Sequence, residues 1–127
     1  MVDRNILLNK LAHYGIRDNP NNLINSFLSD RRQYVELGNS HSNISETILG
    51  TPQGSILSPL LFLIFINDII NCSNILHFHL FADDTCVYLN DANLESLYSV
   101  LNVELGKIGQ WVTANSLSLN VSKSVYL

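Results

Sequence analysis

The sequence has few charged residues, and positive charge is the scarcer kind. Only 14% of its 127 residues are charged, and 7 Lys and Arg against 11 Asp and Glu give a formal net charge of -4. A domain that binds a phosphate backbone by itself needs a basic surface, so we expect weak or no nucleic-acid binding by this acidic chain alone. Hydrophobic residues make up 46%, which is typical of a globular chain. The low charged fraction predicts some apolar surface that contacts another domain.

Cysteines and long apolar runs are also scarce. The two cysteines, Cys72 and Cys86, fit no metal-ligand spacing and favour a reduced, intracellular setting, in the cytoplasm or nucleus. The N-terminus is polar and charged from Asp3 onward, so it has no signal-peptide pattern. The most apolar run, Leu60 to Ile66, is too short to span a bilayer, and we expect no contact with a membrane.

Helix caps and apolar spacing predict four helices, over residues 3–14, 19–28, 59–70 and 92–114. Asp3 and Asn19 are the expected caps of the first two, and Ser58-Pro59 is the expected start of the third. The third helix is apolar nearly all round, which predicts burial on most sides, either inside this domain or against a neighbour. The fourth is amphipathic, with a predicted buried stripe of Leu94, Leu97, Leu101, Leu105, Ile108 and Trp111 or Val112.

Strands are predicted over residues 33–37 and 44–49, on either side of the turn Gly38-Asn39-Ser40. A second hairpin is predicted from residues 75–80 and 85–89, and alternating apolar residues predict a last strand over 118–127.

Two adjacent aspartates, in Phe81-Ala82-Asp83-Asp84, fall at the tip of the second predicted hairpin. Neighbouring carboxylates repel each other unless a cation neutralises them, and hard oxygen ligands in a rigid turn suit Mg2+. Such a site suits phosphoryl or nucleotidyl transfer. Taken alone, a solvated polar loop is the commoner explanation of such a pair.

Three further features are weak when each stands alone. The loop Gly50 to Ser55 places backbone amides and the Gln53 amide at a helix entrance, where glycines allow close approach of a ligand, but it could be a plain turn. His77 and His79 share one strand face and fit ordinary sheet positions better than metal binding. Cys86 is expected in the core, since no histidine partner is obvious.

Together these segments resemble a reverse transcriptase domain of the kind carried by non-LTR (LINE-type) retrotransposons. The motifs that carry the resemblance are Gly50 to Phe62 with Asn67-Asp68, then Phe81 to Asp84, then Trp111, Asn115, Leu117, Leu119, Asn120 and Lys123, with Tyr14 to Ile16 and Ser26 to Arg31 upstream. They cover nearly the whole chain in the family's order.

The resemblance implies an α+β fold, part of a polymerase palm, in which helices pack on one face of a small antiparallel sheet. It implies that Asp83 is a direct ligand of two catalytic Mg2+ ions, with Mn2+ as an alternative, and that Asp84 supports the site. The reaction would be attack of a primer 3'-hydroxyl on the α-phosphate of a deoxynucleotide, copying an RNA template from a DNA primer.

The same resemblance assigns roles to other residues. Pro52, Gln53 and Gly54 would line the pocket for the incoming nucleotide and the template base, and Phe81 would back the primer end. Lys123, which alone would be a surface lysine, would help to neutralise or protonate the departing pyrophosphate. We therefore expect the aspartates and the Gln53 loop to face one cleft.

The chain departs from the family in what precedes and follows its motifs. The family needs another aspartate, on a strand facing the Asp83 hairpin, and Val2 to Leu8 resembles the segment just after it. That aspartate is thus expected before Met1, and Asp3 is a helix cap. Residues 1–127 are expected to form a partial reverse transcriptase domain without the first catalytic strand, most of the fingers and the thumb, which leaves the hairpin with an open edge.

Losing one metal-binding carboxylate costs on the order of 10^3-fold in rate, so the isolated chain is expected to be inactive. An alternative is a non-catalytic relic that acts at most as a structural or interaction module. An unrelated α+β metal-binding domain is a third reading, which requires the Gln53 loop and the aspartates to lie far apart.

Overall fold

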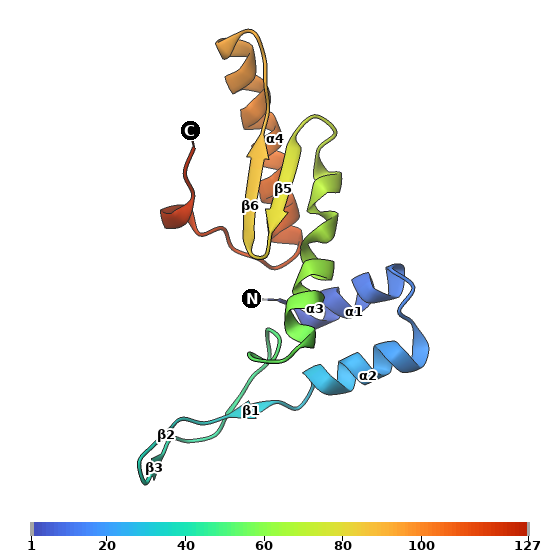
Figure 1. Ribbon diagram of the computed structural model, residues 1–127, viewed down its shortest axis with the longest axis vertical. Coiled ribbons are helices and arrows are strands. Elements are labelled where there is room, and N and C mark those ends of the chain that lie inside the picture. The colour runs from blue at the N-terminus through green and yellow to red at the C-terminus, as the bar shows by residue number, and fades with distance from the viewer. Residues whose placement is uncertain (1, 127) are drawn as a thin grey trace. The chain divides into compact units, whose positions relative to one another are not determined.

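The structure is a computed structural model that describes residues 2–126. The chain divides into two compact units, Met1–Leu61 and Phe62–Leu127, each described below by itself. Figure 1 labels its α-helices and most of its strands.

Two helices, α1 (Arg4–His13) and α2 (Asp18–Leu28), pack together in the first unit around Leu7, Leu11 and Leu28, which are fully buried. The predicted cap of α1 is confirmed, because the Asp3 carboxylate accepts the backbone N–H groups of Asn5 at 2.9 Å and Ile6 at 3.1 Å.

The predicted start of α2 at an Asn19 cap is wrong, because the helix begins at Asp18 and its cap residue, Arg17, makes no side-chain capping bond. Pro20 still falls in the first helical turn, where its missing N–H has no helical partner in any case.

A long hairpin arm follows α2, built from β1 (Arg32–Gln33), β2 (Glu36–Leu37), β3 (Ser40–His41) and β4 (Ser45–Glu46). β1 pairs with β4 and β2 with β3, both antiparallel, around the predicted turn, where Gly38 has φ +60°. The continuous strands predicted over 33–37 and 44–49 are therefore interrupted. All residues of the four strands are exposed, so no buried face fixes a longer register.

The third predicted helix is shorter than expected. The α-helix α3 spans Leu57–Ile66, and the chain continues as the 3-10 helix η1 (Asn67–Cys72). Of the two predicted alternatives, burial inside this domain holds for one face of α3 only, and burial of the rest against a neighbour stays a prediction. One face of α3 is buried through Leu61, Phe65 and Ile66, whereas Leu57, Leu60 and Leu63 are exposed.

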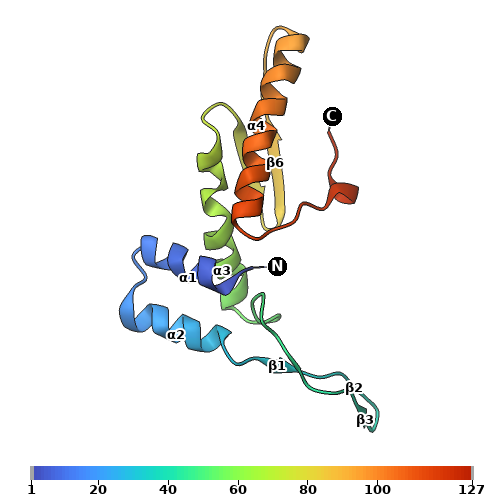
Figure 2. The ribbon, with the colours of Figure 1, turned by 180° about the vertical axis from the view of Figure 1, so that it is seen from behind.

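In the second unit, strands β5 (His77–Phe81) and β6 (Asp84–Tyr88) form an antiparallel hairpin with α4 (Leu94–Ala114) along one face, as both ribbon views show (Figures 1 and 2). The hydrophobic core comprises Ile66, Ile69, Leu76, Ile108 and Val112, with Phe78, Leu80 and Val87 of the hairpin packed against it. The α+β class, with a helix on one face of a small antiparallel sheet, is confirmed.

The buried stripe of α4 differs from the prediction at two positions, Leu94, which is 63% exposed, and Leu105. Ile108 and Val112 are buried as predicted, but Leu105 is 42% exposed, and Glu104, only 4% exposed, lies in the stripe instead. Glu104 is three residues after Leu101 and four before Ile108, so it falls on the same helix face.

The predicted last strand is wrong over the residues that the structure describes. Residues 118–126 hold only the short 3-10 helix η2 (Val121–Lys123), with Val125 and Tyr126 exposed; Leu127 lies outside the described residues. Alternating apolar residues form a strand only beside another strand, and in residues 2–126 none pairs with this segment.

The strands form three separate two-stranded sheets instead of one. Within residues 2–126 no third strand pairs with β5 or β6, so both edges of that hairpin are open. No helix in this part of the chain is long and apolar enough to cross a membrane.

Candidate active site

The aspartate pair lies at a hairpin tip, as predicted. Phe81 pairs with Asp84, which leaves Ala82 and Asp83 as a two-residue turn. Ala82 has φ +52°, a left-handed conformation that is uncommon for a residue with a side chain. The turn is therefore tight, and it holds Asp83 in the turn itself and Asp84 at the start of β6.

The register of the hairpin places Asp84 on the face away from the core. Phe78, Leu80 and Val87 pack against the core cluster, so the alternate positions lie on the other face. These exposed cross-strand pairs are His77 with Tyr88, His79 with Cys86, and Phe81 with Asp84. Phe81 is 77% exposed, so its ring is open to a ligand beside the aspartates.

The other side chains of this face correct one prediction. Cys86, expected in the core, is exposed opposite His79. His77 stacks on Tyr88, with ring centroids 5.0 Å apart and planes 21° from parallel. Across the described residues, no group of three or more His, Cys, Asp and Glu could hold a metal ion, and the histidines occupy ordinary sheet positions.

Asp83 and Asp84 are both exposed, and neither carboxylate makes a hydrogen bond or ion pair with a described residue. Two adjacent carboxylates without a counter-charge repel each other, and a divalent cation relieves that repulsion. Mg2+ in proteins is commonly held by one or two carboxylates, while waters and substrate phosphates supply its other ligands. The pair therefore fits part of such a ligand set, namely two carboxylates.

The loop from Gly50 to Ser55 is folded by its own hydroxyl groups. The Ser58 hydroxyl donates to the Pro52 carbonyl at 2.6 Å, and the Ser55 hydroxyl oxygen accepts the Ser58 backbone N–H at 3.0 Å. Ser55, not Ser58, thus caps the first turn of α3, which corrects the predicted start. Ser55 could have been identified as the cap from the sequence, because a serine that caps a helix commonly accepts the backbone N–H three residues later.

Gln53 and Gly54 lie at the exposed bend of this loop. Gly54 has φ +78°, and a Cβ built there would meet no atom within 4 Å, so a ligand can approach its backbone. Gly50 also has a positive φ, +81°, and its N–H donates to the carbonyl of Val2 at 2.8 Å, which ties the loop to the segment before α1.

Lys123 ends the exposed η2, where its backbone N–H donates to the carbonyl of Asn120 at 3.0 Å. No contact within residues 2–126 joins its side chain to Asp83 or Asp84. The Gln53 loop belongs to the first unit and the aspartates to the second. Because each unit is described by itself, the expectation of one shared cleft stays a prediction.

One buried carboxylate of the second unit, Glu104 on α4, was not predicted from the sequence. The Lys107 ammonium donates to Glu104 Oε1 at 2.6 Å. This bond, and next the nearby Ser73 hydroxyl, lower the pKa of Glu104 below its ordinary value. The sequence does hold a signal for Glu104. It is a charged residue on the apolar face of an amphipathic helix, and a lysine follows it three residues later.

The chain matches the family model described as reverse transcriptase (RNA-dependent DNA polymerase) over residues 1–127. The chain belongs to the reverse transcriptase family, whose members generally use divalent metal ions.

Two curated relatives come from mobile elements of Drosophila melanogaster. The chain is 27% identical to the RNA-directed DNA polymerase from mobile element jockey over 108 residues, which are 80% of this chain and 12% of that relative. It is 29% identical to the probable RNA-directed DNA polymerase from transposon BS over 111 residues, 81% of this chain and 12% of that relative. The resemblance to non-LTR retrotransposon reverse transcriptases is confirmed. No solved structure matches the chain significantly.

Proposed function

We propose that this chain is a palm segment of a retrotransposon RNA-directed DNA polymerase, and that Asp83 and Asp84 are its metal-binding carboxylates. The observation that carries the proposal is the aspartate turn itself. In a chain that matches the reverse transcriptase family over its whole length, two adjacent carboxylates are held on a tight turn, exposed and without a partner from residues 2–126.

In the intact enzyme, Asp83 would bind both catalytic ions, Mg2+ or Mn2+, and Asp84 would support them from the adjacent position. Divalent ions supply charge that stabilises the attacking primer 3'-hydroxyl and the leaving pyrophosphate oxygen. The chain's part is to fix its carboxylates in place. The pairing of Phe81 with Asp84 across a two-residue turn does this. Phe81, exposed on the same face as Asp84, would contact the primer end.

Pro52, Gln53 and Gly54 would line the pocket for the deoxynucleotide and the template base. The Ser58 hydroxyl holds the Pro52 carbonyl, and this bond fixes the bend that exposes the next two residues. Lys123 would neutralise the departing pyrophosphate, and its exposed position leaves the ammonium free to reach a ligand. The partners would be an RNA template, a DNA primer and deoxynucleotides, inside the cell.

By itself, residues 1–127 would not support polymerisation. The aspartate turn supplies two carboxylates, and the family's site needs one more, which would have to come from sequence outside this partial palm. The chain spans only 12% of the length of each curated relative, so the rest of the enzyme's surface for template and primer would also lie elsewhere. Loss of such a ligand costs on the order of 10^3-fold in rate.

A second candidate function is a non-catalytic structural or interaction module. The exposed apolar face of α3, formed by Leu57, Leu60 and Leu63, favours it, because such surfaces often contact another protein part. Metal binding by the aspartates separates the two candidates only in part, since a module that is a relic of the enzyme would keep the pair.

The proposal is tested by measuring Mn2+ binding to the purified chain by electron paramagnetic resonance, with Mg2+ as competitor. We expect weak binding that is lost in Asp83→Asn and kept in Glu95→Gln, an exposed carboxylate at the start of α4. Binding that survives Asp83→Asn would refute the metal site.

Primer extension on an RNA template tests the second part of the proposal. We expect no product from the chain alone. Robust extension that disappears in Asp83→Asn would show that residues 1–127 are sufficient, and would refute their proposed incompleteness.

A further inference from the structure

The junction between η1 and β5 is held by one serine. The Ser73 hydroxyl oxygen accepts the backbone N–H of Ile75 at 3.2 Å and that of Leu76 at 3.0 Å. Leu76 is a member of the hydrophobic core, and β5 begins at the next residue. Ser73 therefore sets the direction in which the chain enters the strand that leads to the aspartate turn.

The Ser73 hydroxyl has one nearby acceptor for its own hydrogen, the Glu104 carboxylate. The Ser73 oxygen accepts two backbone N–H groups, and the same hydroxyl lowers the pKa of Glu104. Ser73 is only 7% exposed, so water does not replace that acceptor freely. A buried hydroxyl of this kind normally donates to a nearby oxygen.

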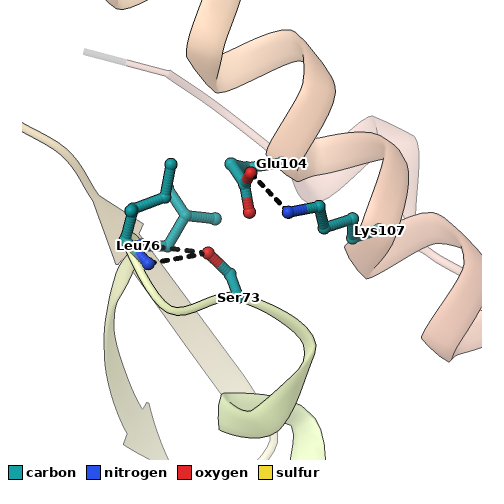
Figure 3. A network of polar contacts seen from close by, with 5 residues as sticks. Ser73, Leu76, Glu104 and Lys107 are labelled. Carbon is teal, nitrogen blue, oxygen red and sulfur yellow. Dashed lines mark hydrogen bonds and ion pairs between the residues drawn. The ribbon is translucent and has the colours of Figure 1, made fainter.

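The Glu104 carboxylate, which faces the Ser73 hydroxyl, has one oxygen without a donor. Glu104 is 4% exposed and receives Lys107 on Oε1, whereas Oε2 is buried without a hydrogen-bond partner. Figure 3 shows the Glu104 carboxylate reaching from α4 toward the Ser73 hydroxyl, with Lys107 on the same helix. Of the buried side-chain polar atoms left unpartnered in the described residues, Glu104 Oε2 is the only one in the second unit.

We propose that the Ser73 hydroxyl donates to Glu104 Oε2, and that Glu104 is thereby a positioning residue for the aspartate hairpin. This bond gives the Ser73 hydroxyl hydrogen an acceptor and gives Glu104 Oε2 a donor. The resulting chain of bonds runs from the Lys107 ammonium through the Glu104 carboxylate and the Ser73 hydroxyl to the amides of Ile75 and Leu76. It joins α4 to the first residues of the hairpin that carries Asp83.

The charges around this network favour an ionised Glu104. Lys107 on α4 is the basic group that contacts it, and its side chain is half-exposed. Cys72 on η1 is the other titratable neighbour; burial, and further the negative charge of Glu104, raise the pKa of its thiol and keep it neutral. An ionised carboxylate accepts a stronger hydrogen bond from Ser73 than a neutral amide would.

The functional part of this inference rests on the proposed metal site at Asp83. It is tested on the full chain with Ser73→Ala, Glu104→Gln, the double variant and Ser73→Thr, which keeps the hydroxyl. Two measurements are made: hydrogen exchange of the Ile75 and Leu76 amides, and the Mn2+ dissociation constant. Glu95→Gln and Ser99→Ala, exposed positions on the same helix, are the matched controls.

We expect each single variant to speed exchange of the Leu76 amide by roughly tenfold, the value of about one hydrogen bond. The Mn2+ dissociation constant should rise about threefold, because a loosened hairpin holds the carboxylates less well. The double variant should be no worse than Ser73→Ala, since both changes break the same chain of bonds. Ser73→Thr and the controls should match the wild type.

A pH titration followed at the Leu76 amide resonance adds a readout that loss of packing would not produce. The resonance should shift with a midpoint below the ordinary pKa of a glutamate, and Glu104→Gln should abolish that shift. If Glu104→Gln unfolds the chain, Lys107→Met removes only the ammonium, and it should move the same midpoint upward.

Additive effects of Ser73→Ala and Glu104→Gln, or an unchanged Leu76 amide in Glu104→Gln, would overturn the Ser73–Glu104 bond. Faster exchange with an unchanged Mn2+ constant would overturn the positioning role alone. A wild-type chain that binds no Mn2+ would instead refute the proposed function, and the exchange data would still decide whether the bond exists.

Discussion

Ala82 is the residue that makes the aspartate turn tight. Its φ of +52° falls in the left-handed region, which costs a residue with a Cβ about 1 to 2 kcal/mol. Such strain is concentrated at functional sites, where a rigid arrangement is needed. The cost supports the view that the turn is built to hold Asp83 and Asp84 in one arrangement, not to connect two strands at the lowest energy.

Ala82→Gly should therefore stabilise the chain slightly. Glycine removes the left-handed penalty but adds unfolded-state entropy worth about 0.4 to 1 kcal/mol, so the net gain is about 0.5 kcal/mol or somewhat more. Urea unfolding measures the change. The matched control is Ala12→Gly inside α1, where the same replacement should destabilise by about 1 kcal/mol. A destabilised Ala82→Gly variant would contradict the strained turn.

Glu104 predicts a dependence of stability on pH. Lys107, and next Ser73, lower its pKa in the folded chain, so the folded state binds the proton less readily than the unfolded state. The stability that Glu104 contributes is thus fully present above the ordinary glutamate pKa. It is lost as the pH falls through the lower folded value.

Free energies of unfolding at pH 7 and at about pH 3 measure this contribution. The stability that Asp91 contributes also falls on acidification, because the Asn93 N–H and then the Ser96 hydroxyl lower the pKa of Asp91. The wild type should therefore lose more stability on acidification than Glu104→Gln, and the difference isolates Glu104. Equal losses in the two proteins would show that the Glu104 pKa is not lowered.

The helix α3 has two faces with different roles. Phe65 is fully buried, whereas Leu63, two residues earlier, is 45% exposed. Phe65→Ala should cost about 3 to 5 kcal/mol of unfolding free energy, because it leaves a cavity in the core. Leu63→Ala should cost about 1 kcal/mol or less, since half of its surface already meets solvent. Urea unfolding of the two variants tests this assignment, and similar losses would contradict it.

The entrance of α3 gives a prediction for the Gln53 loop. Ser55→Ala removes the hydroxyl that accepts the Ser58 N–H and contacts the Ser58 hydroxyl at 2.6 Å. The loss of a helix cap should cost about 1 kcal/mol, measured by thermal or urea unfolding. Ser26→Ala, at an exposed position of α2, is the control and should change stability by about 0.5 kcal/mol at most. An unchanged Ser55→Ala variant would show that Ser55 does not cap α3.

Elements with strong local signals were predictable from the sequence. Asp3 and the following residues specify α1, and the apolar runs around Asp83-Asp84 specify the hairpin, because caps and turns act between near neighbours. Elements that depend on distant partners were not. The apolar alternation after residue 118 has no strand beside it, and the arm from Arg32 to Glu46 has no buried face.

The candidate site was predictable to the same extent. The aspartate turn follows from two adjacent residues, whereas Glu104 acts only because α4 packs against η1 and brings it to Ser73. The amphipathic stripe was predicted with Leu105 in it, since a hydrophobic residue is the better guess at any core position. Only packing decides which of two neighbouring residues, Glu104 or Leu105, faces inward.

Charge is divided unevenly along the whole chain. Residues 1–61 contain five basic and five acidic side chains, including all four arginines, whereas residues 62–127 contain two basic and six acidic ones. The acidic excess therefore lies entirely in the unit that carries the aspartate turn. That unit attracts cations and repels a phosphate backbone, so template and primer would need basic surface from elsewhere in the enzyme.

The exposed apolar surface predicts poor solubility of the isolated chain. Besides the open edges of β5 and β6, the exposed large side chains include Leu57, Leu60, Val125 and Tyr126. We expect concentration-dependent association in sedimentation velocity and a broad thermal transition. A clear, monomeric sample that melts cooperatively would contradict this expectation.

Paramagnetic broadening of backbone amide signals by Mn2+ identifies the residues closest to the bound ion. We predict that amides 81–85 broaden first as Mn2+ is added, that Mg2+ reverses the effect, and that Asp83→Asn abolishes it. Broadening centred on another segment, or broadening of 81–85 that persists in Asp83→Asn, would contradict the assignment of these aspartates as the metal site.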